Sequence, residues 1–280
     1  MRPLSFIVMF SILCLGRVDA QIIHRALVFG LGKQMDSCWG KIHGDNDIYY
    51  VVNLLQQLGY TDIRTLKNEQ ATKSAMVQAF VDLANRCNKG DEVYVHYSGH
   101  GQLMSDVNGD ESLKWNSAHS QWDESWIPFD AYMYYGEKDR GEKHLCDDEI
   151  ALLLQRIRRK IGKKGTLTVV VDACHSGDAT CGDDDEYIRG VDVKFCIPKD
   201  IHTKSVEPIE EEWRTISACR PYQLCSEIKQ SRVGKLTFAL YTLGTLADKL
   251  TNQQLEKKLT AEYEKYGGRI RQNPMVTGKK

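Results

Sequence analysis

Two short stretches of this sequence gather residues that could do chemistry, and each follows an apolar run. The first, HYSGHG, covers His96–Gly101, and the second, VVVDACHSG, covers Val169–Gly177. A thiol such as that of Cys174 attacks as a thiolate, and an imidazole such as that of His100 can accept its proton and later protonate a leaving amine. These residue types indicate acyl transfer through a cysteine. Two alternatives remain open: Cys174 as a small buried core residue, and His100 as a loop histidine held by hydrogen bonds.

Alternating strands and helices must position these stretches. Continuous apolar runs predict strands at His24–Leu31, Thr61–Leu66, Asp91–Gly101, Thr166–Cys174 and Arg214–Cys219. Apolar residues at helical spacing predict helices at 46–60, 71–87, 147–161, 237–249 and 252–266. Because strands that alternate with helices form parallel sheets covered on both faces, the predicted fold class is α/β with a mainly parallel central sheet. Two longer segments, at about 103–145 and about 180–213, are predicted to be irregular.

The carboxyl ends of the strands are where function is expected. Open α/β sheets hold their sites in the loops beyond these ends. If the two strands that precede His100 and Cys174 are parallel, their loops open on the same edge and bring the two residues together. The main-chain N–H groups of Gly101 and Cys174 are then candidates for an oxyanion hole, in which a single donor changes the rate by roughly 10²–10³.

The composition is typical of one globular domain. The chain has 280 residues, of which 42% are hydrophobic and 27% are charged, and its formal net charge is −1. A chain of this length buries one substantial core more readily than two small ones. The near-zero charge gives no electrostatic reason to expect nucleic acid or an anionic membrane as a partner.

The first 20 residues have the pattern of a secretory signal peptide. Arg2 supplies the positive charge, Leu4–Gly16 is an apolar run too short to span a bilayer comfortably, and Val18–Ala20 precedes a cleavage point before Gln21. We expect one mature domain at 21–280, secreted or periplasmic, with no stable membrane association after cleavage. A buried strand or a membrane anchor is the alternative.

Export would place the cysteines in an oxidising compartment. Eight cysteines follow residue 20, and no two form the CxxC spacing of a zinc ribbon. If Cys174 works as a free thiol, at least one other cysteine also stays unpaired. Cys181 and Cys196 flank an acidic loop and could be joined, although spacing does not determine the pairing.

The two chemical stretches resemble the His and Cys boxes of the caspase-like cysteine peptidases (family C14), and the metacaspase branch in particular. GDNDIYYVVNLLQQLGY is similar to the family's first helix, LCDDEI to the segment before the Cys strand, ISACRPYQ to the strand after the linker, and GKLTFALYTLGTL to a later helix. The resemblance implies a caspase-like fold with His100 as the catalytic histidine and Cys174 as the nucleophile. His96 and His175 also match the motifs, but packing or loop hydrogen bonding is expected for them.

Asp172, two residues before the nucleophile, predicts the specificity. Caspases that cleave after aspartate carry Gln at this position. A carboxylate here favours a guanidinium or ammonium group and repels aspartate, so peptide or protein substrates with Arg or Lys before the cleaved bond are expected. The resemblance adds Asp47 to this pocket, and Ser98 of the His box is assigned to its lining.

Calcium is the expected activator, although the chemistry itself needs no cofactor. SDVNGDES, at Ser105–Ser112, invites an EF-hand interpretation, but Glu111 stands where that loop needs Gly, so the motif is rejected. The resemblance instead indicates Asp147 and Asp148, with contributions near Asp130 and from the loop after the Cys box. In that loop the position that matches the family's ligand is Cys181, and Asp183 is only nearby. The alternative is that the loop is simply acidic and solvated.

Two irregular segments carry further hypotheses. The charged segment at about 180–213 contains Arg189, Lys194, Lys199 and Lys204, and is a candidate for self-processing by an enzyme that cleaves after basic residues. The aromatic-rich segment contains Trp115, Trp122, Trp126, Tyr132, Tyr134 and Tyr135. It either covers the site or forms a satellite core.

Other classes of protein stay open. A catalytically silent binding or regulatory protein could keep the caspase fold, although both His100 and Cys174 are present. A redox or metal-binding protein would need closely spaced ligand pairs. A nucleotide-binding protein would need a glycine loop, and Phe29–Ser37 offers only two glycines at the wrong spacing. Alkylation of the active-site thiol separates the peptidase from all three.

Overall fold

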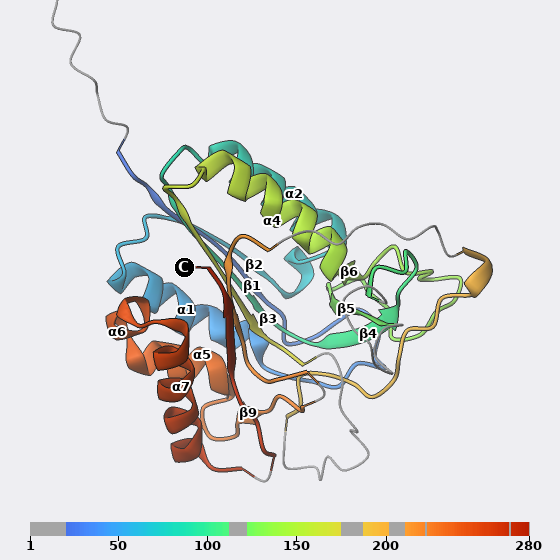
Figure 1. Cartoon of the computed structure of the whole chain (residues 1–280). Coiled ribbons are helices and arrows are strands. Elements are labelled where there is room, and N and C mark those ends of the chain that lie inside the picture. The colour runs from blue at the N-terminus through green and yellow to red at the C-terminus, as the bar shows by residue number, and fades with distance from the viewer. Residues whose placement is uncertain are drawn as a thin grey trace, which may run out of the picture.

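A six-stranded sheet forms the centre of the molecule (Figure 1). The computed structural model describes residues 21–111, 122–174, 187–201, 211–221, 223–268 and 270–279. The sheet order is β11-β8-β7-β3-β1-β2. Its strands are β1 (His24–Gly30), β2 (Asp62–Lys67), β3 (Glu92–Ser98), β7 (Thr166–Asp172), β8 (Arg214–Ser217) and β11 (Met275–Gly278). All neighbours are parallel except β11 on β8, which confirms the predicted α/β class.

The apolar strands pair in a register that fixes the functional edge. Strands β1 and β3 are buried at all but their first residue, as expected for a parallel sheet covered on both faces. Strands β3 and β7 are neighbours, and Ser98 at the end of β3 lies opposite Asp172 at the end of β7. His100 and Cys174 each follow two residues later, so both chemical stretches leave the sheet at the same level.

Helices cover both faces of the sheet (Figure 1). One face packs on α2 (Lys73–Arg86) and α4 (Asp147–Ile161). The other packs on α1 (Gly44–Gln57), α5 (Lys235–Leu243) and α7 (Asn252–Tyr266), with the short α6 (Thr245–Lys249) between the last two. Helices α4 and α7 have the predicted bounds. Acidic residues begin α4 and basic residues end it, as the helix dipole favours, and Thr251 caps α7 in a capping box.

Part of the segment predicted to be irregular forms a small antiparallel sheet. Its strands are β4 (Gly101–Ser105), β5 (Trp122–Trp126) and β6 (Leu145–Cys146), in the order β4-β5-β6. The prediction was wrong here because these strands are only two to five residues long and show no regular apolar alternation. A second pair, β9 (Glu227–Ile228) with β10 (Val233–Gly234), was also not predicted, nor was β11. Short 3₁₀ turns occur at Asn68–Gln70 and Lys199–Ile201.

The aromatic residues of this segment divide between core and surface. Trp126 stacks on Tyr97 with ring centroids 4.6 Å apart and 6° between the planes, and it also packs against the core of β1 and α2. Tyr134 is exposed, and Trp115 lies outside the described residues. For Trp126, the core alternative is therefore the one observed.

Two further features bear on the sequence predictions. The seven cysteines within the described ranges are unpaired thiols, whereas Cys181 lies outside these ranges. Among the described residues, no helix combines the length and apolar character needed to cross a bilayer. The predicted signal peptide at 1–20 lies outside the described residues.

Candidate active site

His100 and Cys174 lie at the adjacent ends of β3 and β7, and both are almost fully buried. The His100 Nε2 atom lies 2.7 Å from the carbonyl oxygen of Gly40. A carbonyl only accepts, so Nε2 carries the proton and Nδ1 is the basic nitrogen. Among the described residues, Nδ1 has no hydrogen-bond partner, so its lone pair is available to a thiol proton.

Burial keeps the His100 imidazole and the Cys174 thiol uncharged in this structure. Burial lowers the pKa of His100 to about 4, and the hydrogen bond to Gly40 only partly opposes this. Burial also raises the pKa of the Cys174 thiol. The indole of Trp39 covers the imidazole, with ring centroids 5.2 Å apart. At neutral pH the pair is therefore a neutral thiol and a neutral imidazole.

The two main-chain N–H groups predicted to form an oxyanion hole donate to one oxygen. Gly101 N lies 3.2 Å and Cys174 N lies 3.0 Å from the carbonyl oxygen of Arg189. The next residue, Gly190, packs directly on Cys174, and a Cβ atom there would collide with the Sγ and carbonyl oxygen of Cys174. The Arg189–Gly190 peptide bond thus lies beside Cys174, with its carbonyl oxygen bound by both N–H groups.

The side chain of Arg189 fills an acidic pocket, which we define as Asp47, Asp172 and Glu227. All four side chains are buried. Asp47 accepts two hydrogen bonds from the guanidinium, at 2.6 and 3.0 Å, and Glu227 Oε1 accepts two more, at 3.0 and 3.1 Å. The Asp172 carboxylate lies farther away, at 3.5 Å. Although burial opposes the charge, these carboxylates hold the pKa of Arg189 above its usual value.

Asp172 lies at the base of the acidic pocket. Its Oδ2 atom accepts hydrogen bonds from the main-chain N–H and the hydroxyl of Thr237, at 2.8 and 2.7 Å. Burial raises its pKa, while the charge of Arg189 opposes that rise. Gly234 closes the pocket, because a Cβ atom there would meet the Asp172 carboxylate and the Arg189 guanidinium.

Ser98, which was also assigned to the lining of the pocket, contacts His96 and Thr237 rather than Arg189. The Ser98 hydroxyl lies 2.9 Å from His96 Nε2 and 3.5 Å from the Thr237 hydroxyl, and it makes no described hydrogen bond to Arg189. Burial lowers the pKa of His96 to about 4, so this histidine is a neutral packing residue. His175 lies outside the described residues.

Sequence reasoning missed Glu227 and Thr237. Glu227 also accepts from the main-chain N–H of His43 and pairs with that ring, at 2.7 Å in each case. Nothing in the local sequence around Glu227 indicates a pocket, since its position depends on the short β9–β10 pair and its contacts with Tyr187 and His43. Thr237 stands within the stretch that resembles a family helix, which was the one available signal.

Residues just before Arg189 pair with residues 225–227 through the main chain. Ile188 forms an antiparallel bridge with Ser226. Arg189 N donates to the carbonyl of Cys225 at 2.8 Å, and Glu227 N donates to the carbonyl of Tyr187 at 3.0 Å. The Tyr187 ring packs edge-on against His43, 4.5 Å between centroids. Main-chain pairing of this kind holds a peptide in a fixed register.

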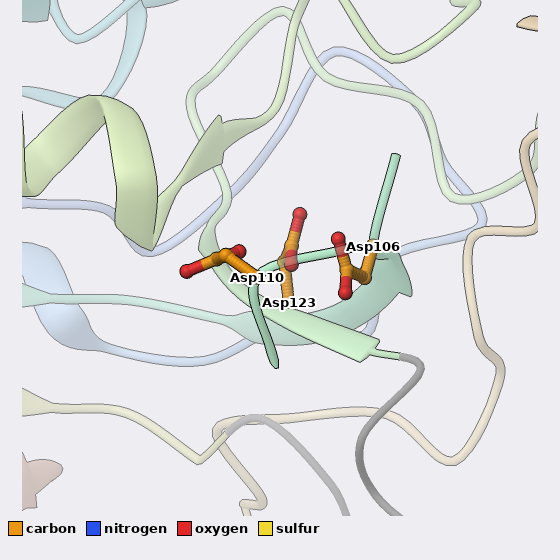
Figure 2. Close-up of side chains that lie close together, drawn as sticks. All are labelled: Asp106, Asp110 and Asp123. Atoms are coloured by element: carbon orange, nitrogen blue, oxygen red, sulfur yellow. The ribbon is translucent and has the colours of Figure 1, made fainter. Parts of the chain in front are cut away.

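A second acidic cluster lies at the small sheet, where Asp106, Asp110 and Asp123 come together (Figure 2). Each offers a carboxylate oxygen within 4.8 Å of the others, and all three are buried. Burial raises the pKa of Asp123 to about 9, with smaller contributions from the charges of neighbouring aspartates that include Asp147 and Asp148. Asp123 Oδ1 is buried without a hydrogen-bond partner in the described parts of the chain. This donor set fits a hard cation.

The predicted metal ligands have different positions. Asp147 and Asp148 begin α4 and lie near the cluster, where Asn108 donates a side-chain hydrogen bond to Asp148. Asp130 lies elsewhere: its carboxylate accepts from the main-chain N–H of Lys73 at the start of α2, at 2.8 Å. Asp183 lies outside the described residues. The repeated aspartates of Ser105–Ser112, set aside with the EF-hand motif, were the signal for Asp106 and Asp110.

Comparison with known proteins identifies the family. Residues 25–181, more than half of the chain, match the family described as metacaspase, peptidase C14 domain. The chain belongs to the metacaspase family. Metacaspase-1 of Meyerozyma guilliermondii is 25% identical over 248 residues, which cover 85% of this chain and 50% of that protein. Metacaspase-1A of Aspergillus terreus is 31% identical over 176 residues, which cover 59% and 37%. The chain therefore spans half the length of these relatives or less.

Solved structures show the same fold. A Geobacter sulfurreducens protein superposes with a TM-score of 0.62 and 20% identity, over 92% of this chain and 94% of that one. Caspase-1 of Spodoptera frugiperda superposes with a TM-score of 0.59 and 12% identity, over 92% and 86%. At these identities the likeness concerns the fold alone, and it confirms the predicted caspase-like fold.

The covered thiol predicts slow alkylation of the intact chain. Cys174 is neutral and lies against Gly190, whereas Cys196 is exposed. With iodoacetamide at pH 7.5, Cys174 should react at least about tenfold more slowly than Cys196, because the reactive species is an accessible thiolate. Mass spectrometry of the two peptides gives both rates in one sample. Equal rates would contradict the covered position of Cys174.

Proposed function

We propose that this metacaspase is a cysteine endopeptidase that cleaves peptide bonds after Arg or Lys. Cys174 is the nucleophile, His100 the base, and Gly101 and Cys174 donate to the oxyanion. One observation carries the proposal: Arg189 lies across the site as a substrate would. Its carbonyl oxygen accepts from both predicted oxyanion donors, and its guanidinium is bound by Asp47 and Glu227.

The reaction follows from these positions. His100 Nδ1 takes the proton from Cys174, and the thiolate attacks the carbonyl carbon that follows the basic side chain. The two N–H groups stabilise the negative oxygen as it forms. The imidazolium then gives its proton to the leaving amine, and water hydrolyses the thioester with His100 again as the base.

The acidic pocket accounts for the specificity. A guanidinium fork can bind Asp47 with two parallel hydrogen bonds, as Arg189 does. A lysine ammonium can bind the same carboxylates as a point charge, so Lys is accepted but is weaker than Arg. An aspartate side chain would place a fourth carboxylate among three that are already buried, which is strongly unfavourable.

Fluorogenic peptides that end in Arg, Lys or Asp test this function. The chain should release the dye from Arg and Lys peptides, with kcat/KM for Asp at least about 10²-fold lower, because the pocket repels it. Cys174→Ala should abolish release. Asp47→Asn should lower kcat/KM for Arg by about tenfold or more through the lost bidentate pair, while Asp192→Asn, at an exposed position, serves as the matched control.

Release from Asp peptides but not from Arg or Lys peptides would contradict the assigned pocket. The chain could also hydrolyse none of these peptides, with Cys174 still unreactive when Arg189 is released from the pocket without unfolding. That result would favour a catalytically silent protein that kept the fold.

We further propose that the intact chain is a precursor that processes itself at Arg189–Gly190. The segment already occupies the cleft on both sides of that bond, so the first cleavage needs no encounter with a second molecule. The neutral Cys174 and His100 oppose the reaction until the thiol proton is transferred. Cleavage would free a new N-terminus at Gly190 and allow the arginine to leave the pocket.

Self-processing predicts one dominant fragment that begins at Gly190. N-terminal sequencing and intact mass would identify it, and its rate should not depend on protein concentration. Arg189→Gln should block this cleavage, because a neutral amide leaves the pocket carboxylates without their cation. Lys194→Gln, a change at an exposed residue of the same segment, should leave it unchanged. A first cut after Lys194 or Lys199 would contradict the proposal.

Calcium is proposed as the activator, held by Asp106, Asp110 and Asp123. When bound, the ion would neutralise carboxylates that now lie buried together. Asp106 directly follows Ser105, whose N–H donates to Phe195 O at 3.0 Å and whose hydroxyl accepts from Ile197 N at 2.9 Å. The cluster is therefore one residue from the contacts that hold the segment after Gly190, which supports a link between cation binding and release of the segment.

Titration calorimetry of the Cys174→Ala chain with calcium tests this site. We expect one site whose affinity falls at least about tenfold in Asp123→Asn and in Asp106→Asn, since each removes a charged oxygen ligand. Asp130→Asn should bind as the parent does, because Asp130 lies away from the cluster. The proposal fails if Asp130→Asn abolishes binding while Asp123→Asn does not.

We also propose, from the sequence pattern alone, that residues 1–20 direct secretion. The predicted cleavage before Gln21 would leave β1, which begins at His24, intact. The partners are then peptides and proteins with basic residues at accessible positions outside the cytoplasm.

A further inference from the structure

Residues 190–197 lie in a trough along β4, on the far side of the proposed cleaved bond. Gly190 forms a parallel bridge with Gly101, and Phe195 forms one with Met104. Phe195 N donates to Leu103 O at 2.8 Å. The two bridges are five residues apart in the segment and three apart in β4, so β4 holds the segment at its two ends and two extra segment residues lie between them. Binding of a peptide to the main chain of a strand in this way is a form of β-augmentation.

A buried glutamine fixes this strand between its two bridges. The Gln102 side-chain amide donates to Val193 O at 2.8 Å and to Met133 O at 3.0 Å. Its carbonyl oxygen accepts from His144 Nε2 at 2.9 Å. All the polar atoms of this buried side chain therefore have partners. The partner in the segment is the main-chain carbonyl of Val193, which any residue can supply, so Gln102 sets register without selecting a side chain.

The side chains of the segment alternate between the trough and solvent. Val191 and Val193 pack against an apolar wall of Trp39, Ile127, Ala131 and Met133. Asp192 and Lys194 are exposed. Phe195 is completely buried and packs with Met104 and Ile197. This period of two is that of a strand with one bound face.

Phe195 packs between the rings of His144 and Tyr135, which we call the aromatic seat. Its ring lies 4.2 Å from the His144 ring centroid and 6.0 Å from that of Tyr135, at 65° to the latter. Buried aromatic anchors in a preformed pocket carry much of the binding energy of an interface. Gly190 is the opposite case, because the contact with Cys174 leaves no room for a side chain there.

We propose that this trough is a substrate-binding site for the residues that follow the cleaved bond. It selects glycine directly after the basic residue, small branched aliphatic residues at the second and fourth positions, and an aromatic residue at the sixth. The natural substrates are then extended protein segments with this pattern after Arg or Lys. The inference rests on the proposed peptidase function and adds the specificity on the second side of the bond.

Internally quenched peptides test the trough. The parent peptide has the sequence of Tyr187–Ile197 with Cys196→Ser, and it is compared with its Phe195→Ala and Asp192→Ala versions. With the self-processed chain, kcat/KM should fall at least about tenfold for Phe195→Ala, because the aromatic anchor is lost. It should stay within about twofold for Asp192→Ala, whose side chain faces solvent.

Changes in the protein locate the preference. In Tyr135→Ala the ratio of kcat/KM between the parent and Phe195→Ala peptides should fall to about 2 or less, because the seat has lost a wall. In the neighbouring Tyr134→Ala the ratio should match that of the unchanged protein, since Tyr134 is exposed.

The outcomes separate this inference from the peptidase proposal. A short peptide that ends in an Arg-linked dye has no residues to place in the trough. If this short peptide is hydrolysed and the parent, Phe195→Ala and Asp192→Ala peptides all have the same kcat/KM, the trough binds only the chain's own segment. The inference is then overturned. If no Arg peptide of either length is hydrolysed, the peptidase proposal itself fails. A loss of preference in Tyr134→Ala but not in Tyr135→Ala would also overturn the inference.

Discussion

The structure of the site depends on one buried cation among three carboxylates. Asp47, Asp172 and Glu227 come from distant parts of the chain, and they are buried together around the guanidinium of Arg189. Removing the cation from such a set typically costs about 3–5 kcal/mol, because the carboxylates are left without compensation. In this structure the acidic pocket holds the guanidinium of Arg189. Among the described residues, the cation that satisfies these carboxylates is the chain's own Arg189.

The position of Arg189 determines where its own carbonyl group and Gly190 lie. With its side chain fixed, its carbonyl reaches the two main-chain donors at Gly101 and Cys174, and Gly190 must pass directly over the thiol. Gly190 lies against the Cys174 thiol, and burial raises the pKa of that thiol although the charge of Arg189 lowers it. Under the proposed function, specificity and inhibition have one physical cause, because the segment that fills the acidic pocket is also the one that covers the thiol.

The sequence predicted the sheet edge and the reacting pair because these follow from local patterns. Continuous apolar strands predict parallel pairing, so the sequence alone was enough to place His100 and Cys174 at the same sheet edge. The partners that complete the site could not, because Glu227 reaches it only through the fold of a short, patternless strand. Arg189 was one of several basic residues in a charged segment, and it is distinguished by the burial of its side chain against Asp47 and Glu227, which come from distant parts of the chain. The acidic cluster around Asp123 was missed because its loop fails the one motif that would have signalled it.

A double-mutant cycle between Arg189 and Asp47 tests the central claim most directly. In the Cys174→Ala chain, which cannot process itself, the free energy of unfolding in urea is measured for Arg189→Met, Asp47→Asn and the pair. A bidentate buried contact predicts a coupling of at least about 1 kcal/mol, whereas Lys194→Met with Asp47→Asn should be additive within about 0.5 kcal/mol. Additivity of Arg189→Met and Asp47→Asn would mean that the arginine does not occupy the pocket, and would contradict the account.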